Sequence, residues 1–284
     1  MTATAVEAAG WFGVSLVSLL GDPLVIVGLG IVVYFFGDWL PVIGDRLDAD
    51  RGALLFASIV GAMALSITLK TGFALERPPG AADLPGASGM PEFIEGLYTR
   101  IVGPGGYAFP SGHATAAAVG WLGLALAFRK QKRNRPLVLA GGIVAAIAAS
   151  RVALGVHRPI EVVVGTAVGL AYLLVVFEVL ERPRGAFGLA GLIGTFSPVV
   201  IELSGDGLLA VGVALGTAIG AAGIRQRDGG RWMQAGLATA AVVVVTAATF
   251  VRTGGSETLV ALVGLVAGAL VVTVRRSIHG VENE

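Results

Sequence analysis

Ser-Arg-Val-Ala-Leu-Gly-Val-His-Arg-Pro-Ile-Glu, residues 150–161, is a polar stretch between two apolar runs, 136–149 before it and 162–180 after it. Runs of this kind are typical of helices that cross a membrane. An Arg, a His and a Glu at the edge of hydrocarbon are costly unless they have partners and a function. The stretch therefore predicts two membrane helices joined by a turn that carries functional side chains.

The order of residues in this stretch also predicts how its side chains are arranged. Pro159 suits the first turn of a helix, so a new helix is expected to begin near Arg158. Glu161 lies four residues after His157, close enough to accept a hydrogen bond from one imidazole nitrogen and leave the other free as a nucleophile or base. The alternative is that Glu161 only caps the helix, and that His157 and Arg151 are interfacial anchors.

The composition of the whole chain agrees with a membrane protein. Of its 284 residues 55% are hydrophobic and 14% are charged, and the mean hydropathy is +0.82. A soluble domain of this length does not cover so much apolar surface. The net charge of +1 gives no reason to expect a nucleic-acid partner, and the absence of cysteine excludes disulfides and thiolate chemistry.

The apolar runs predict an all-α, polytopic helical bundle with about nine spans. A core at 1–184 contains the first group of runs, which lie at 24–40, 52–69, 111–128, 136–155 and 158–180. Residues 4–20 form a shorter run that either spans the membrane or lies in its interface. An extension at 185–284 of unknown function adds the runs 186–203, 207–224, 232–251 and 259–274.

The positions of the basic residues predict the orientation of the bundle. With the basic loop 129–135 in the cytoplasm, alternating spans place most Lys and Arg residues inside. The basic residues then left outside are Lys70, Arg77, Arg100, Arg151, Arg158 and Arg252. Most of these lie beside the polar motifs of the chain, and anion binding would explain their position. Arg158 itself is interpreted as an interfacial anchor.

The long loop at 78–109 is rich in Gly and Pro and is expected to lie outside. One face of a short helix within it would carry Ile94, Leu97, Tyr98 and Ile101. We expect this amphipathic helix, over 90–102, to lie on the membrane surface, where it would gate the access of a lipid.

Three polar motifs are expected to meet at the outer membrane face. The first is Lys70 with Arg77-Pro78, the second is the sequence 110–113 (Pro-Ser-Gly-His), and the third is the stretch 150–161. The run 111–128 is about 27 Å long as a helix at ~1.5 Å per residue, and the next run returns to the starting side.

Together these motifs offer the chemistry of a phosphate-ester site. One guanidinium group can donate hydrogen bonds to two phosphoryl oxygens at once. A helix that starts after Ser111 adds backbone N–H donors. One imidazole can attack phosphorus while the other protonates the leaving oxygen. Cations would neutralise the transition-state charge. No grouping in the sequence has convincing metal-ligand spacing, so no metal or cofactor is predicted.

The pattern K-x6-R-P, P-S-G-H and S-R-x5-H-x3-D resembles the type 2 phosphatidic acid phosphatase (PAP2) superfamily, over roughly residues 10–182. That family includes lipid phosphatases, polyprenyl diphosphate phosphatases and vanadium-dependent haloperoxidases. The first two motifs match in full, and Ser150, Arg151 and His157 match the third. The family's final Asp is Glu161 here, which keeps the charge and moves the carboxylate by about a bond length.

The resemblance implies a role for each matched residue. His157 would be the nucleophile, Glu161 the carboxylate that orients it, and His113 the general acid. The residues that would hold the phosphate are Lys70, Arg77, Ser111, Gly112 and Arg151. The expected activity is metal-independent hydrolysis of a lipid phosphomonoester or polyprenyl diphosphate through a phosphohistidine, in the cell membrane and on its outer face.

Two other classes of function stay open at this point. One is a lipid or small-molecule carrier with a vestigial phosphatase site, in which the extra C-terminal spans do the work. The other is a vanadate-dependent oxidoreductase of the haloperoxidase type, although those relatives are typically soluble. Nothing in the sequence predicts the oligomeric state. The glycines Gly165 and Gly169 are interpreted as sites of close helix packing.

Overall fold

The computed structural model describes residues 4–37, 47, 49–103, 105–128, 134–200, 213, 216 and 264–270. The predicted basic loop at 129–135 lies almost wholly outside these residues. Most of the last three predicted spans and His279 also lie outside them.

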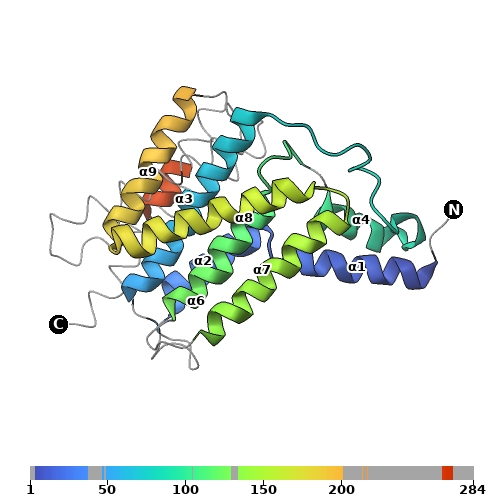
Figure 1. Ribbon diagram of the computed structural model, residues 1–284, viewed down its shortest axis with the longest axis horizontal. Coiled ribbons are helices and arrows are strands. Elements are labelled where there is room, and N and C mark those ends of the chain that lie inside the picture. Colours follow the sequence, from blue (N-terminus) through green and yellow to red (C-terminus); the bar gives the residue numbers. More distant parts are fainter. Residues whose placement is uncertain are drawn as a thin grey trace.

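Every regular element in the described ranges is a helix, so the prediction of an all-α membrane bundle is confirmed. In chain order these are α1 Ala5–Leu19, α2 Pro23–Phe36, α3 Ala49–Phe73, η3 Ala87–Gly89, α4 Glu92–Val102, α5 Gly112–Ala117, η4 Ala118–Leu122, α6 Gly123–Ala127, α7 Arg135–Ala153, α8 Pro159–Leu174, η5 Val175–Leu180 and α9 Pro183–Val200. Figure 1 shows α3, α8 and α7 forming the body of the bundle, with α9 against α3.

Three of the described helices are long and apolar enough to cross a membrane, namely Asp50–Phe73, Arg135–Ala153 and Pro159–Leu180. They occupy most of three runs predicted as spans. The helix from Gly112 to Ala127 is apolar but shorter. The helices α1 and α2 meet the same criterion only as a pair bent by 46°, which makes them either a broken span or a re-entrant loop.

The bend between α1 and α2 is fixed by the sequence at Gly21, Asp22 and Pro23. Asp22 caps α2, because its Oδ1 accepts hydrogen bonds from the backbone N–H groups of Leu24 (2.8 Å) and Val25 (3.4 Å). Pro23 occupies the first turn of α2, where its missing N–H is not needed. A Cβ at Gly21 would lie 2.5 Å from Ile147 Cγ2, so the bend fits closely against α7.

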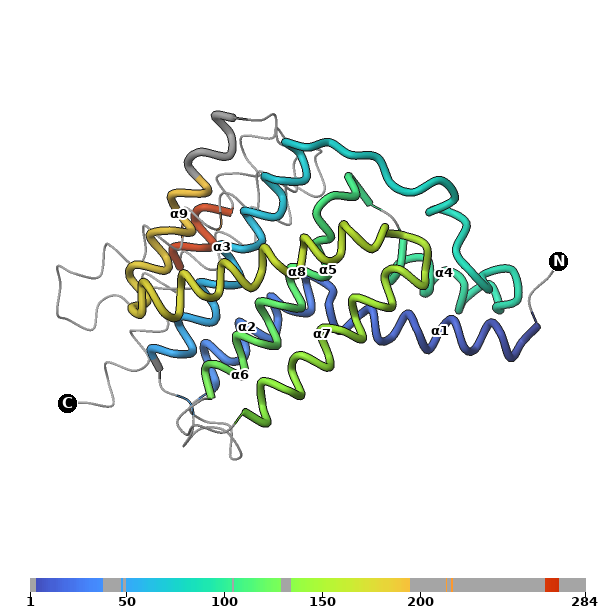
Figure 2. The backbone as a smooth tube through the Cα atoms, in the orientation of Figure 1, coloured from blue at the N-terminus to red at the C-terminus, as the bar shows by residue number. Residues whose placement is uncertain are grey.

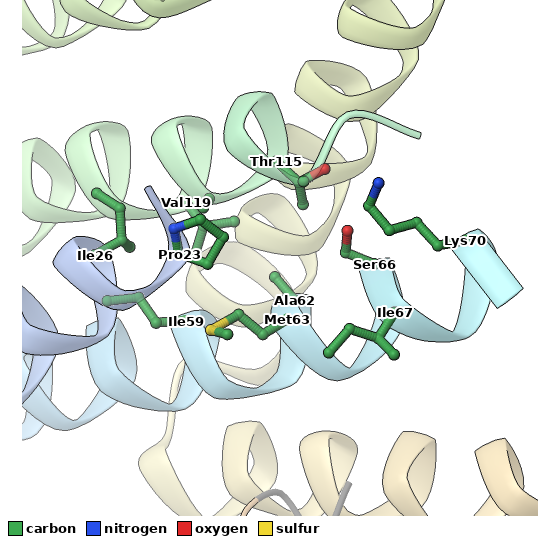
Figure 3. Close-up of a pocket in the computed structure, with 12 residues that line it drawn as sticks. Pro23, Ile26, Ile59, Ala62, Met63, Ser66, Ile67, Lys70, Thr115 and Val119 are labelled. Carbon is green, nitrogen blue, oxygen red and sulfur yellow. The ribbon is translucent and has the colours of Figure 1, made fainter. Parts of the chain in front are cut away.

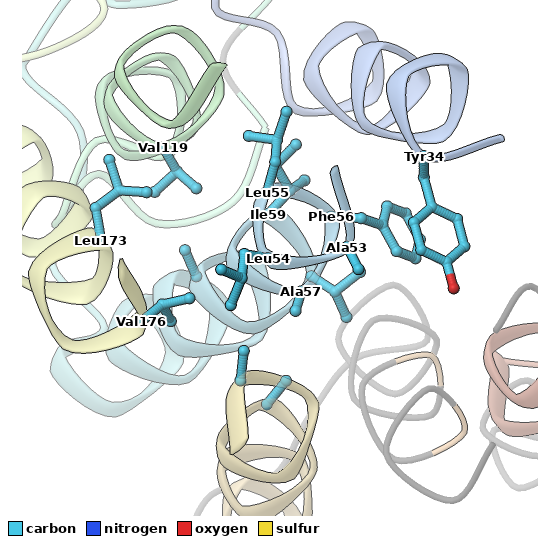
Figure 4. Packing of buried hydrophobic residues seen from close by; sticks show 14 of the residues in the cluster. Tyr34, Ala53, Leu54, Leu55, Phe56, Ala57, Ile59, Val119, Leu173 and Val176 are labelled. Atoms are coloured by element: carbon cyan, nitrogen blue, oxygen red, sulfur yellow. The ribbon is translucent and has the colours of Figure 1, made fainter. Parts of the chain in front are cut away.

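The main hydrophobic core surrounds α3 (Figure 4). Leu55 and Ile59 of α3 are fully or almost fully buried, and Phe56 stacks on Tyr34 of α2 with ring centroids 5.0 Å apart. Leu173 closes the core from α8. These contacts pack the middle of α3, the helix that carries Lys70 near its end, against several other helices.

A second hydrophobic cluster joins α1 to α4, at the end of the molecule where Figure 2 shows the two helices side by side. Tyr98 of α4 is fully buried, and its hydroxyl donates to Pro85 O at 2.9 Å. Ile94 and Ile101 pack against the same cluster. Most of the apolar face of α4 therefore packs on protein, mainly on α1, and Leu97 is the member that stays exposed. A position of α4 at the membrane surface stays a prediction.

Candidate active site

The first motif comes from the end of α3 and the segment that follows it. Lys70 Nζ donates to the backbone carbonyl of Tyr107 at 2.6 Å. Arg77 donates to the carbonyls of Gly105 at 2.6 Å and Gly106 at 3.1 Å. It also donates to Val156 O at 2.9 Å. The two cations therefore hold the segment before the second motif against the turn that carries the third.

The second motif begins the helix α5. Ser111 is the N-cap residue, and its hydroxyl faces the backbone N–H of Ala114 at 3.5 Å. A Cβ at Gly112 would lie 3.3 Å from Lys70 Cε, so the missing side chain leaves room for the lysine. The Ser111 N–H donates to Glu161 O at 2.9 Å. This bond ties the second motif directly to the third.

Close approach of α8 to the start of α5 depends on Gly165. A Cβ at this position would lie 2.5 Å from Ser111 O and 3.1 Å from Ser111 N. The hydroxyl of Thr115 bridges the two helices, with Ser111 O at 3.1 Å and Gly165 O at 3.0 Å. These contacts agree with the interpretation of Gly165 as a packing glycine.

In the third motif His157 and Glu161 form a buried pair. His157 Nδ1 donates to Glu161 Oε2 at 2.9 Å, and the two residues are 4% and 2% exposed. The same oxygen accepts the backbone N–H of Arg158 at 3.0 Å, while Oε1 accepts from Arg158 Nη1 at 3.0 Å. The two interpretations of Glu161 therefore hold together, because it caps α8 and orients His157 at the same time.

Arg158 is more than the interfacial anchor expected from the sequence. Its guanidinium pairs with Glu161 and also donates to the carbonyl of Glu76 at 3.2 Å. The side chain is 48% exposed, so it covers the carboxylate from the solvent side. The three-residue spacing to Glu161 is the one feature of the sequence that points to this contact.

The electrostatic surroundings of His157 favour its neutral form. Burial lowers the pKa of His157 from 6.5 to about 2, with a further contribution from the positive charges of Arg77, Arg151 and Lys70. Since Nδ1 donates to Glu161, Nε2 carries the lone pair. This nitrogen lies 3.4 Å from Arg77 Nη1. An unprotonated nitrogen therefore faces the cations that would hold an anion.

Several buried polar atoms around the site have no hydrogen-bond partner in the described part of the chain. They are Arg151 Nε, His113 Nε2 and Ser66 Oγ. Arg151 is 1% exposed, and its Nη1 donates to Ser18 Oγ at 2.8 Å. Buried polar groups are nearly always paired, so unpaired donors such as Arg151 Nε are what an anion would satisfy.

The three motifs thus lie together in the described structure. His113, His157, Lys70, Arg77 and Arg151 are close enough to influence one another's charge. Their roles in binding and catalysis remain predictions.

Two residues near the α1–α2 bend reach the site without being predicted from the sequence. Ser18 contacts Arg151, and Asp22 Oδ2 lies 3.8 Å from His113 Nε2. In the sequence Asp22 marks only the end of an apolar run, and a single Ser in such a run gives no signal.

An apolar cavity of about 100 Å³ opens beside the phosphate-binding candidates (Figure 3). Its polar end is formed by Lys70, Ser66 and Thr115, and the rest runs between α2 and α3 toward Ile26 and Ile59. The remaining lining residues are Pro23, Ala62, Met63, Ile67, Gly112, Ala116 and Val119. The cavity has room for a few methylene groups next to a charged head.

Comparison with known proteins gives one family. The family model described as the PAP2 superfamily matches residues 51–184. No curated protein and no solved structure matches the chain. The matched range contains all three motifs and excludes α1 and α2.

Proposed function

Residues 51–184 belong to the PAP2 superfamily, and on this premise we propose that the protein is a membrane phosphatase that hydrolyses a lipid phosphomonoester or diphosphate. The observation that carries the proposal is the buried His157–Glu161 pair, whose free nitrogen faces Arg77. A neutral, oriented imidazole beside three cations is suited to attack on phosphorus.

The proposed reaction has two steps. His157 Nε2 attacks phosphorus, the N–P bond forms, and the bond from phosphorus to the leaving oxygen breaks as His113 gives that oxygen a proton. Water then attacks the phosphohistidine, His113 takes a proton from the water, and the N–P bond breaks to release phosphate and restore His157. Throughout, the cations and the N–H groups at the start of α5 would stabilise charge on the phosphoryl oxygens.

The choice of a lipid substrate is supported by the cavity between α2 and α3. Its walls are almost wholly apolar, and Lys70 of the phosphate-binding candidates lies at its polar end. Gly112, which also lines the cavity, lies beside Lys70. A phosphate held by these residues would direct the first methylene groups of a chain into the cavity. The distribution of basic residues supports a site at the outer face of the cell membrane.

The direct test is phosphate release by the purified protein in detergent and in the presence of a chelator. The substrates are phosphatidate, a phosphatidylglycerophosphate-like lipid and a polyprenyl diphosphate, with the His157→Ala variant as background. We expect release from at least one lipid, at a rate that the chelator does not change. Release from none of them would refute the proposal, and loss of activity in chelator would refute its metal independence.

Narrowing the cavity should discriminate between substrates by chain length. Met63 lines the cavity, and Met63→Trp is expected to raise KM for a long-chain lipid phosphate at least about tenfold, because the indole takes the space of the chain. KM for methyl phosphate, which has no chain to place in the cavity, should change little. Val138→Trp is the control, since Val138 lies on α7, is 70% exposed and is outside the cavity lining. Equal effects on both chain lengths would contradict this use of the cavity.

A further inference from the structure

Asp22 lies in the α1–α2 bend, outside the range that matches the family, and its carboxylate is directed at the general-acid candidate His113. We propose that Asp22 is a positioning residue that fixes the orientation and stabilises the protonated form of His113. This inference rests on the proposed phosphatase function and deepens it.

The two carboxylate oxygens of Asp22 have different neighbours. Oδ1 accepts the backbone N–H groups of Leu24 and Val25 at the start of α2. Oδ2 lies 3.8 Å from His113 Nε2, which is buried and has no hydrogen-bond partner in the described part of the chain. One oxygen is therefore held by the backbone, and the other lies near the unpaired ring nitrogen of His113.

The bend that carries Asp22 is rigidly placed. Trp121 Nε1 donates to Leu20 O at 3.0 Å, just before the bend. A Cβ at Gly21 would lie 3.2 Å from His113 O and 2.5 Å from Ile147 Cγ2. The backbone next to Asp22 thus touches the same residue whose imidazole the carboxylate faces, so the pair cannot drift apart without disturbing α5 and α7.

The surrounding charges explain why His113 needs this carboxylate. The groups facing it are Arg151 of α7, Lys70 of α3, Arg77 of the following loop and His157. Burial disfavours the charged, protonated form of His113 most, and the first three of these groups are cations that disfavour it further, whereas a general acid must carry that proton when the substrate is bound. Asp22 brings a negative charge to the same place from the α1–α2 bend.

The proposal assigns the protons on His113 to its two nitrogens. Nε2–H points to Asp22, and Nδ1–H is the proton given to the leaving oxygen. After the first step His113 is neutral and keeps Nε2–H, so Nδ1 can take a proton from the attacking water. The arrangement repeats the logic of the His157–Glu161 pair, in which one ring nitrogen is held by a carboxylate and the other reacts.

The test uses Asp22→Asn, because Asn caps a helix about as well as Asp and removes only the charge. Two substrates are compared, an alkyl phosphate and a nitrophenyl phosphate that carries an alkyl chain of the same length. We expect kcat/KM, which reports the steps up to departure of the leaving group, to fall by about 10- to 100-fold for the alkyl phosphate, since an alkoxide needs a proton to leave. The nitrophenolate leaves without one, so kcat/KM for that substrate should fall by less than about threefold.

Two further variants define the comparison. His113→Ala should give the same selective loss with a larger factor, and Asp22→Glu should restore part of the rate on the alkyl phosphate. Inhibition by inorganic phosphate should not weaken in Asp22→Asn, because removing a negative charge near Arg151 does not oppose anion binding. A folding defect would weaken this inhibition.

The outcomes separate this inference from the proposed function. Equal loss on both substrates, or no loss on either, would overturn the role of Asp22 while leaving the phosphatase activity in place. Wild-type protein that releases phosphate from neither substrate would overturn the proposed function itself, and the role of Asp22 with it.

Discussion

Replacing His157 by alanine should lower phosphate release by a factor of about 10³ or more, because the reaction loses its nucleophile. His157 is 4% exposed, its Nδ1 is held by Glu161 at 2.9 Å, and its Nε2 faces Arg77. Steady-state phosphate release from the best lipid substrate measures the loss.

The same variant tests the covalent intermediate. Wild-type protein mixed with a radiolabelled lipid phosphate and quenched in alkali should retain label that acid removes, as expected of a phosphohistidine, and His157→Ala should retain none. The matched control is His279→Ala in the polar segment 275–284, far from the motifs in sequence. Turnover by His157→Ala within about threefold of wild type would refute the assignment of the nucleophile.

The second large effect is expected for Glu161→Gln, with a fall in kcat of about 10²- to 10⁴-fold. Glu161 accepts hydrogen bonds from His157 Nδ1, from Arg158 N and from Arg158 Nη1. A glutamine has one acceptor oxygen, so its NH₂ group must face one of these donors. The imidazole would lose its fixed tautomer, and the Arg158 guanidinium would lose its ion pair.

Glu161→Asp separates the charge of this side chain from its reach. This variant has the Asp of the PAP2 motif, but its carboxylate would lie about 1.5 Å, roughly one bond length, farther from His157. We expect kcat to fall by about tenfold, since the backbone of this chain places His157 for the longer side chain. Melting temperatures in detergent show whether either variant is unfolded. A fully active Glu161→Gln protein would refute the orienting role of the carboxylate.

The features predicted well from the sequence are those set by local spacing. Pro159 starts α8, and His157 and Glu161 are four residues apart, so their contact depends on one helical turn. The lengths of the apolar runs predict that two successive spans bring the chain back to the end of the bundle where it started. Chain length and helix geometry were enough to bring the three motifs together.

The features that were missed depend on tertiary placement. Asp22 and Ser18 reach the site only because the α1–α2 bend fits against α5 and α7, and no periodic pattern encodes that docking. The structure has the apolar face predicted for α4. An apolar face, however, does not indicate whether a membrane or a neighbouring helix covers it. Tyr98 is covered by protein because α1 lies across it.

The hydrogen bond from Arg151 to Ser18 determines how short an active fragment of this protein can be. Arg151 belongs to the range matched by the family, whereas Ser18 precedes it. A fragment trimmed to 51–184 would keep every motif residue but remove the hydroxyl to which the Arg151 guanidinium donates, at a cost of roughly 1.5–3 kcal/mol. A shortened or fused version of the catalytic unit should therefore include α1 and α2.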